Sequence, residues 1–458
     1  MRKFFKALLV FLFLYISSVS LFSQETDKII SSFFDEALTD RTAYGHLKYL
    51  CKQTGGRICG SDAAAKAVRY TMQALRDAGA DTVWLQEVQV PHWVRGTEKC
   101  TIISKKQKST DLSVATLGLS VPTPMNGLTA GVIEVKNIQD LQTKDRKQIE
   151  GKIVFFNNKV DNRLVNTFTG YSGAVRERTM GAAEASKYGA VAVIVRSVTQ
   201  SLDDFPHTGV TSYDDGTDKI PAVAVSTLGA ESLSNYIKND PDLRIRLLTK
   251  CKRYNDTISY NVIGEIRGSE KPHEIITAGG HLDSWDITEG AHDDAGGCVQ
   301  AIEMIRMYKK LGIRPKRTIR AVMFMNEEMS GTGGRKYAQS GEGNGDVHYA
   351  ALESDRGVMS PRGFSFDAEG KRLQDLQSLQ KWFNPYNISE FEKGGGGSDI
   401  NPLKAKGALL IGYLPDPQRY FSYHHSANDT FDQVNIRELQ MGSAAIASLI
   451  YLIDMSDL

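Results

Sequence analysis

Residues 274–297 read EIITAGGHLDSWDITEGAHDDAGG, and this stretch decides the fold. Its first seven residues, Glu274–Gly280, predict a strand, and residues 296–311 predict a helix because apolar residues recur there at helical spacing. A strand that leads through a loop into a helix is the repeating unit of a largely parallel sheet. His281 and Asp293 lie in the connecting loop, where such sheets place their ligand-binding residues.

The chain on either side continues the same alternation. Strands are predicted at Thr318–Asn326 and Val347–Glu353, and the last helix at Ile436–Ile453. Ahead of them, Ala63–Ala78 predicts a helix and Val83–Val90 a strand. We therefore expect an α/β domain with a mixed central sheet and helices on both faces, which is a three-layer α/β/α arrangement.

A middle segment interrupts this domain. Short strands are predicted at Lys152–Phe156, Val191–Arg196 and Ile220–Val225, with small-residue or amphipathic helices between and after them. This pattern predicts a separate α/β module over residues 115–253. The first domain would then consist of residues 24–114 and residues 254–458.

The first 23 residues have the pattern of a secretory signal peptide. Arg2, Lys3 and Lys6 precede an uncharged, mostly apolar run over residues 7–22. We expect residues 1–23 to be removed from an exported, periplasmic or extracellular protein. The run is short for a membrane span, although an uncleaved anchor is an alternative. No later stretch is interpreted as a membrane span.

Charge and cysteine content limit the remaining classes. The formal net charge is +1 over 458 residues, so no basic surface favours nucleic acid as a partner. The five cysteines contain no C-x-x-C motif, which argues against metal binding by cysteine. In an exported protein, Cys51 with Cys59 and Cys100 with Cys251 are possible disulfides, and Cys298 is expected to be a free thiol.

Five metal-capable side chains follow predicted strands or lie in the loops after them: His281, Asp293, Glu328, Asp355 and His425. Zinc takes imidazole and carboxylate ligands, usually four, and a catalytic zinc leaves one position open. This inventory suits two zinc ions. His281 and Asp355 would hold one, Glu328 and His425 the other, and Asp293 would bridge both.

Two more acidic residues are assigned catalytic roles. Asp283 follows His281 by two residues and could accept its free ring N–H, which would fix the tautomer of that histidine. Glu327 precedes a predicted ligand and is placed to act as general base, taking a proton from water and returning it to the leaving amine.

These motifs, GHLDSWD at 280–286, GAHDDAGG at 290–297, NEE at 326–328, ESD at 353–355 and YHHS at 423–426, resemble those of the co-catalytic di-zinc exopeptidases, with the strongest likeness to the plasma glutamate carboxypeptidase type. The resemblance covers nearly the whole mature chain. It implies that the middle module is a protease-associated insert, that the ligands fall on the residues named above, and that the protein could form a homodimer. Its frame favours His425 over His424 as ligand.

Substrate contacts are predicted from four residues. Ser398 and Asp399 follow a run of four glycines, whose backbone could approach a ligand closely, and Tyr423 and His424 flank the predicted ligand His425. Arg176 and Arg178 of the insert could also reach the active site, but a solvated role is the simpler interpretation of such residues.

The sequence thus predicts a zinc exopeptidase that acts on dipeptides or the ends of short peptides. One alternative is an acyltransferase like the glutaminyl cyclases, which resemble this family but hold one zinc. Another is a receptor-like binding module that has lost its metals. Which terminus of the peptide is recognised is not decided by these motifs.

Overall fold

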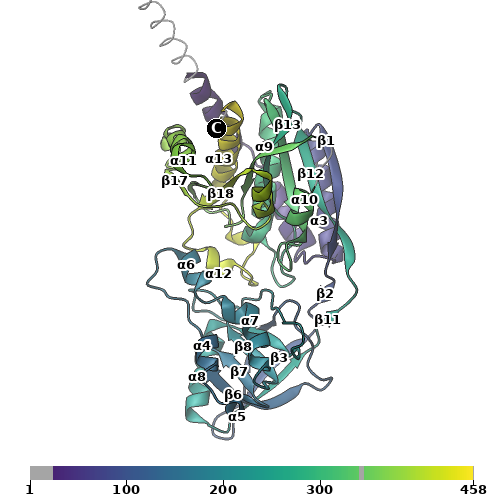
Figure 1. Ribbon diagram of the computed structural model, residues 1–458, viewed down its shortest axis with the longest axis vertical. Helices are drawn as coiled ribbons and strands as arrows, with labels where there is room; N and C mark the ends of the chain where they lie inside the picture. The colour runs from purple at the N-terminus through teal and green to yellow at the C-terminus, as the bar shows by residue number, and fades with distance from the viewer. Residues whose placement is uncertain (1–23, 340–344, 457–458) are drawn as a thin grey trace, which may run out of the picture.

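The computed structural model describes residues 24–339 and 345–456, which fold into two lobes built on separate eight-stranded sheets (Figure 1). The predicted signal peptide, residues 1–23, lies outside the described residues. The chain begins in the first lobe, passes through the second and returns to the first.

The first sheet is mixed and has a parallel centre. Its order is β1 (Thr82–Val90), β12 (Thr257–Ile266), β14 (Arg317–Phe324), β13 (Lys271–His281), β15 (Val347–Glu353), β18 (Leu409–Pro415), β16 (Pro361–Phe366) and β17 (Glu390–Lys393). The four strands β14, β13, β15 and β18 run parallel to one another, and β12 and β16 flank them antiparallel. The carboxyl ends of the four central strands therefore share one edge.

Helices cover both faces of this sheet. Alternate side chains of β14 enter different cores, with Met323 among residues of α9 (Gly296–Lys310) and α13 (Ile436–Met455), and Phe324 beside Tyr337 of α10 (Thr332–Ala338). All eight residues of β14 are buried, and its second half, residues 321–324, is a continuous apolar run, as expected of a strand covered on both faces. The three-layer prediction is confirmed.

Helix ends follow their sequence cues. Ser61 caps α3 (Asp62–Asp77) by accepting a hydrogen bond from Ala64 N, and Asn435 caps α13 in the same way.

By length and composition α13 could cross a membrane, contrary to the expectation that no later stretch qualifies, but it is mostly buried against α9. It is the core helix of the first lobe.

The second sheet has the order β4 (Thr110–Leu112), β3 (Glu98–Ile103), β10 (Arg244–Thr249), β6 (Leu128–Val135), β7 (Ile153–Phe156), β8 (Ala192–Arg196), β9 (Ala222–Val225) and β5 (Val114–Thr116). α8 (Thr227–Asn239) packs on one face and α7 (Arg176–Ser186) with α4 (Ile138–Leu141) on the other. Strands β3 and β4 precede residue 115, so this sheet also uses residues ahead of the predicted insert.

The proposed disulfides were wrong. All five cysteines are buried free thiols. The Cys59 sulfur lies 3.2 Å from Asn326 Oδ1, and the Cys251 sulfur lies 3.2 Å from the carbonyl oxygen of Ser120. Each thiol is packed as a small core side chain, a common role of free cysteine.

The two lobes are joined beside the edge where the central strands end. Arg95 forms an ion pair with Asp286, at 2.6 Å, and the Trp285 ring is fully buried against Gly118 of the second lobe. A short two-stranded ribbon of β2 (Trp93–Val94) and β11 (Lys252–Arg253) carries both crossings of the chain (Figure 1).

We predict that Gly118→Ala destabilises the protein by about 1–3 kcal/mol, because a Cβ at this position would overlap the Trp285 ring and force the lobes apart. Urea denaturation would measure the change. Gly131→Ala is the matched control, since a Cβ there meets only Lys152 Cγ at 3.9 Å. Equal midpoints for the two variants would contradict the proposed contact.

Candidate metal centre and active site

The four central strands of the first sheet bring the predicted metal residues to one place. His281 ends β13, Glu327 and Glu328 follow β14, Asp355 follows β15, and His425 lies in the segment after β18. Residues separated by more than a hundred positions therefore meet at one edge of the sheet.

Asp293 occupies the middle of this group. One carboxylate oxygen, Oδ1, lies 3.0 Å from His281 Nε2, which is also 3.4 Å from Asp355 Oδ1. The other oxygen, Oδ2, lies 3.4 Å from His425 Nε2, which is 3.0 Å from Glu328 Oε2. Each oxygen of Asp293 thus faces a different histidine–carboxylate pair.

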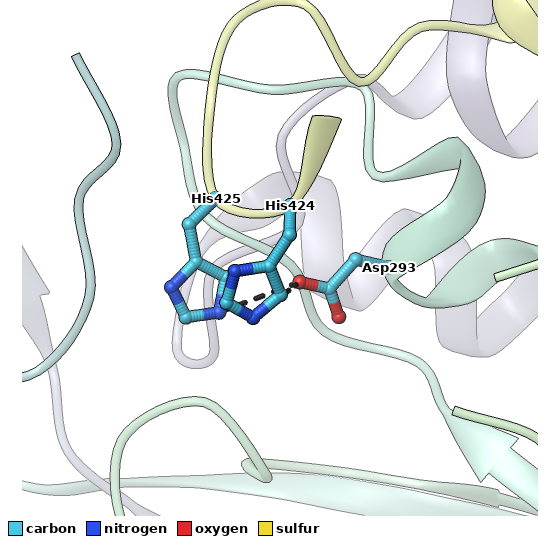
Figure 2. Close-up of side chains that lie close together, drawn as sticks. All are labelled: Asp293, His424 and His425. Atoms are coloured by element: carbon cyan, nitrogen blue, oxygen red, sulfur yellow. Dashed lines mark ion pairs between the residues drawn. The ribbon is translucent and has the colours of Figure 1, made fainter. Parts of the chain in front are cut away.

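His424 lies beside His425 and also faces Asp293 (Figure 2). The two imidazole rings stack with centroids 3.5 Å apart, and His424 Nε2 is 3.7 Å from Asp293 Oδ2. Only His425 also reaches Glu328, which favours His425 as the ligand of that pair.

Both outer histidines present Nε2 to carboxylate oxygens. His281 Nδ1 is 2.9 Å from the carbonyl oxygen of Asp283, and His425 Nδ1 is 3.2 Å from that of Thr208. A carbonyl only accepts, so each contact favours a proton on Nδ1, and Nε2 then faces the carboxylates. A proton or a metal cation at Nε2 would satisfy both the nitrogen and the carboxylate oxygen that it faces.

Buried polar atoms without partners support the same conclusion. Asp293 Oδ2, Glu328 Oε1 and Asp355 Oδ1 are buried and accept no hydrogen bond from described residues. Such atoms are rare in native proteins unless an ion or water satisfies them. Imidazole nitrogens and carboxylate oxygens are the donor set of zinc, so the residues present fit two such ions.

The pKa values reflect this crowding of negative charge. Burial, then the charge of Asp293, raises the pKa of Glu328 well above its usual value. Burial raises the pKa of Asp355 to about 6 and, with the charge of Asp355, that of Glu353 to about 8. Burial lowers the pKa of His281, but the carboxylates of Asp355 and Asp293 outweigh it and raise the pKa well above its usual range.

The predicted contact of the Asp283 carboxylate with His281 was wrong. The ring N–H of His281 is directed at the main-chain carbonyl of Asp283, while the carboxylate Oδ1 is 3.9 Å away. That carboxylate instead accepts main-chain N–H groups from Asn326 at 2.7 Å and Glu327 at 3.2 Å. Asp283 therefore fixes the turn that carries Glu327 and Glu328, since loops of fixed shape need their N–H groups satisfied.

Two further carboxylates hold the backbone around Asp293. Asp294 accepts the main-chain N–H groups of His281 and Gly297, and Asp429 accepts those of His292 and Asp293. Asp294, the neighbour of Asp293, is thus held by main-chain N–H groups, although it also lies close enough to His281 and Asp355 to share a metal ion with them.

The four residues predicted to contact substrate have different positions. Ser398 donates a hydrogen bond to Glu327 Oε1, so it lies beside the predicted base. Asp399 is fully buried, and neither of its carboxylate oxygens has a described partner. Tyr423 stacks on His292 with ring centroids 5.1 Å apart, whereas His424 lines the cavity beside the metal residues.

A cavity of about 250 Å³ opens onto this group, and its walls include residues that the sequence did not reveal. Tyr171, Arg178 and Val210 come from the second lobe, and Met329, Ser330 and Tyr420 come from the first. Only Arg178 had been considered, because no local pattern marks a residue that crosses from another sheet.

Residues 261–450 match the sequence pattern of peptidase family M28. Carboxypeptidase Q of Bos taurus is 34% identical over 90% of this chain and 85% of its own length. The solved structure of a peptidase M28 precursor from Shewanella amazonensis is 32% identical, covers 95% of this chain and 98% of its own, and superimposes with a TM-score of 0.91. A zinc aminopeptidase of Bacillus subtilis, 20% identical, shares the fold, with a TM-score of 0.64 over 90% of this chain and 94% of its own.

We predict that the melting temperature of the metal-free protein falls as the pH rises from about 6.5 to 8.5. Burial raises the pKa of Asp429 to about 7, and burial with Asp355 raises that of Glu353 to about 8, so the folded state binds more protons than the unfolded state in this window. Stability held by these protons is lost as they leave.

The buried histidines do not oppose this trend. Burial lowers the pKa of His207 and of His292 to about 4, and their effect on stability ends at the unfolded value of 6.5. Thermal melts after chelation, compared with melts after zinc is restored, test the prediction. A metal-free melting temperature that rises across the window would contradict it.

Proposed function

The chain belongs to peptidase family M28 and is a metallopeptidase, and on this premise we propose that it is an exported exopeptidase with two co-catalytic zinc ions. It would hydrolyse dipeptides or the terminal residues of short peptides. The observation that carries the proposal is Asp293, whose two oxygens face two separate histidine–carboxylate pairs.

The residues divide into two ligand sets. His281 and Asp355 would hold one zinc, Glu328 and His425 the other, and Asp293 would contribute one oxygen to each. When bound, the two ions supply Lewis acidity that activates water and polarises the scissile carbonyl.

Glu327 is the proposed general base. It lines the cavity next to Glu328, and its main-chain N–H is held by Asp283. Its carboxylate would take the proton from the attacking water and return it to the leaving amine. Ser398 donates to one of its oxygens and so orients the carboxylate.

The small cavity supports a short substrate. Its volume of about 250 Å³ is below the roughly 300–1,000 Å³ typical of pockets for drug-sized ligands. The second lobe, which we propose is the protease-associated insert, closes one side with Tyr171, Arg178 and Val210. A folded protein chain could not enter such a site.

Export is supported by the charged and apolar sequence of residues 1–23. The alternatives of a one-zinc acyltransferase or a metal-free binding module are less well supported. All five proposed ligands are present and close together, and three of them have buried oxygens without partners that metal ions would satisfy.

Zinc content together with dipeptide hydrolysis tests the proposal. We expect two zinc ions per chain by elemental analysis and hydrolysis of unblocked dipeptides that stops after chelation and returns with zinc. One zinc per chain with cyclisation of amino-terminal glutamine would favour the acyltransferase. Two zinc ions without hydrolysis of any dipeptide would favour the binding module.

We predict that Glu327→Gln retains both zinc ions and lowers kcat by about 100-fold or more, because it removes the base and no ligand. Glu328→Gln is the matched neighbour and should lose zinc, since Glu328 lies 3.0 Å from His425 Nε2. Zinc per chain and kcat would be measured for both. Zinc loss in Glu327→Gln would make Glu327 a ligand and refute its role as base.

A further inference from the structure

The segment that leads to the proposed ligand His425 is held by the second lobe. Residues 417–425 follow β18 of the first sheet and include the short helix α12 (Tyr420–Tyr423). Four main-chain carbonyl oxygens of this segment accept hydrogen bonds from residues of the second lobe. The acceptors are Pro417, Phe421, His424 and His425, and the donors are Thr167, Thr199, His207 and Thr208 in the same order.

The last two of these contacts lie directly at the proposed ligand. His207 Nδ1 is 2.7 Å from the carbonyl oxygen of His424, and the main-chain N–H of Thr208 donates to the carbonyl oxygen of His425 at 2.9 Å. The His425 ring also contacts Thr208, because its Nδ1 lies 3.2 Å from the Thr208 carbonyl oxygen. Both the backbone and the ring of His425 therefore depend on the second lobe.

The backbone of His425 needs such support. Its φ is +63°, a left-handed conformation that is disfavoured for a residue with a Cβ and persists where surrounding contacts fix it. The two peptide groups on either side of a Cα atom determine its φ and ψ. One of these groups carries the His424 carbonyl and the other the His425 carbonyl, so His207 and Thr208 hold one group each.

His207 is itself tied to the second sheet. Its main-chain N–H donates to Ser197 Oγ at 2.8 Å, and this hydroxyl donates to the carbonyl oxygen of Val225, the last residue of β9, at 2.7 Å. Burial lowers the pKa of His207 to about 4, so its ring is neutral at pH 7 and has a single N–H. Since a carbonyl only accepts, the contact with His424 favours this proton on Nδ1.

We propose that His207 is a positioning residue of the metal centre, which fixes the backbone at His425 so that the second lobe sets the affinity of the zinc ion held by Glu328 and His425. This inference rests on the proposed two-zinc function and adds a role for the second lobe beyond closing the cavity. The other ion depends less on this contact, because its ligands His281 and Asp355 follow strands of the first sheet.

A role of His207 in stability alone makes a different prediction. Loss of a buried side chain from the second lobe would then lower the melting temperature and leave the affinities of both zinc ions as they are. A positioning role instead weakens one ion of the two. Separate affinities for the two ions therefore distinguish the roles.

The experiment titrates the metal-free, full-length protein with zinc in chelator-buffered solutions and measures zinc per chain. Wild type should bind two ions. His207→Ala should weaken one ion by about 10–100-fold, the usual effect of removing a group that orients a metal-ligating histidine, and leave the other unchanged. His207→Asn should recover most of the lost affinity, because its side-chain amide can place an N–H where Nδ1–H was.

Two further variants identify the ion and the cause. His425→Ala should lose the same ion, and adding His207→Ala to it should not lower the zinc content further, because both substitutions act on one ion. Leu233→Ala is the control for stability, since Leu233 lies on α8 and is fully buried in the core of the second lobe. It should lower the melting temperature and retain both ions.

Unchanged affinities in His207→Ala, equal weakening of both ions, or the same selective loss in Leu233→Ala would overturn the inference. If wild type then binds two zinc ions and hydrolyses dipeptides, the proposed function stands. Fewer than two zinc ions in wild type would overturn the proposed function and this inference with it.

A milder variant keeps the test decisive if His207→Ala does not fold. Thr199→Val keeps the shape of the side chain and removes the hydroxyl that donates to the Phe421 carbonyl. It should weaken the same ion by about 3-fold or more, the effect of one hydrogen bond. Unchanged affinity for both ions in this variant would overturn the inference.

Discussion

The structure depends on how a buried, strongly negative cluster is held together. Asp293, Glu328 and Asp355 have buried oxygens without partners, and Nε2 of His281 and of His425 faces the Asp293 carboxylate. Such an arrangement repels itself unless protons or metal ions neutralise it. The fold must therefore position these side chains firmly enough to withstand repulsion until metal binds, which couples metal binding to stability.

Hydrogen bonds between buried side chains and the main chain hold the loops that carry the proposed ligands. Asp283, Asp294 and Asp429 are themselves buried carboxylates, yet each is satisfied by main-chain N–H groups of the segments that carry the proposed ligands and base. Arg57 adds a complementary tie, since its guanidinium donates to the carbonyl oxygens of Leu282, Glu289 and Gly290. The loops are thus held by side chains that do not line the cavity.

Much of this could be predicted from the sequence. Parallel strands place their following loops at one edge, so His281, Glu328, Asp355 and His425 could be grouped from their positions after strands. The carboxylate of Asp283 was misassigned because sequence spacing cannot show that a main-chain carbonyl is nearer than a carboxylate. Arg178 could not be assigned, because it comes from a separate sheet whose placement depends on packing such as that of Trp285 on Gly118. Strand β3 was missed because it pairs with distant β10, and the edge strand β4 pairs with β3.

The ion pair between Arg95 and Asp286 and the packing of Trp285 fix the distance between the two lobes close to the cavity. The groups that would break the bond lie on one lobe, and Arg178 of the cavity wall lies on the other. The width of the cavity between the lobes is consequently set at this joint. On the proposed function, a longer peptide would not fit between the two lobes. No contact with its side chains would be needed to exclude it. Substitutions at Arg95 or Gly118 would then change the length of peptide that fits the cavity, without changing any residue around Asp293.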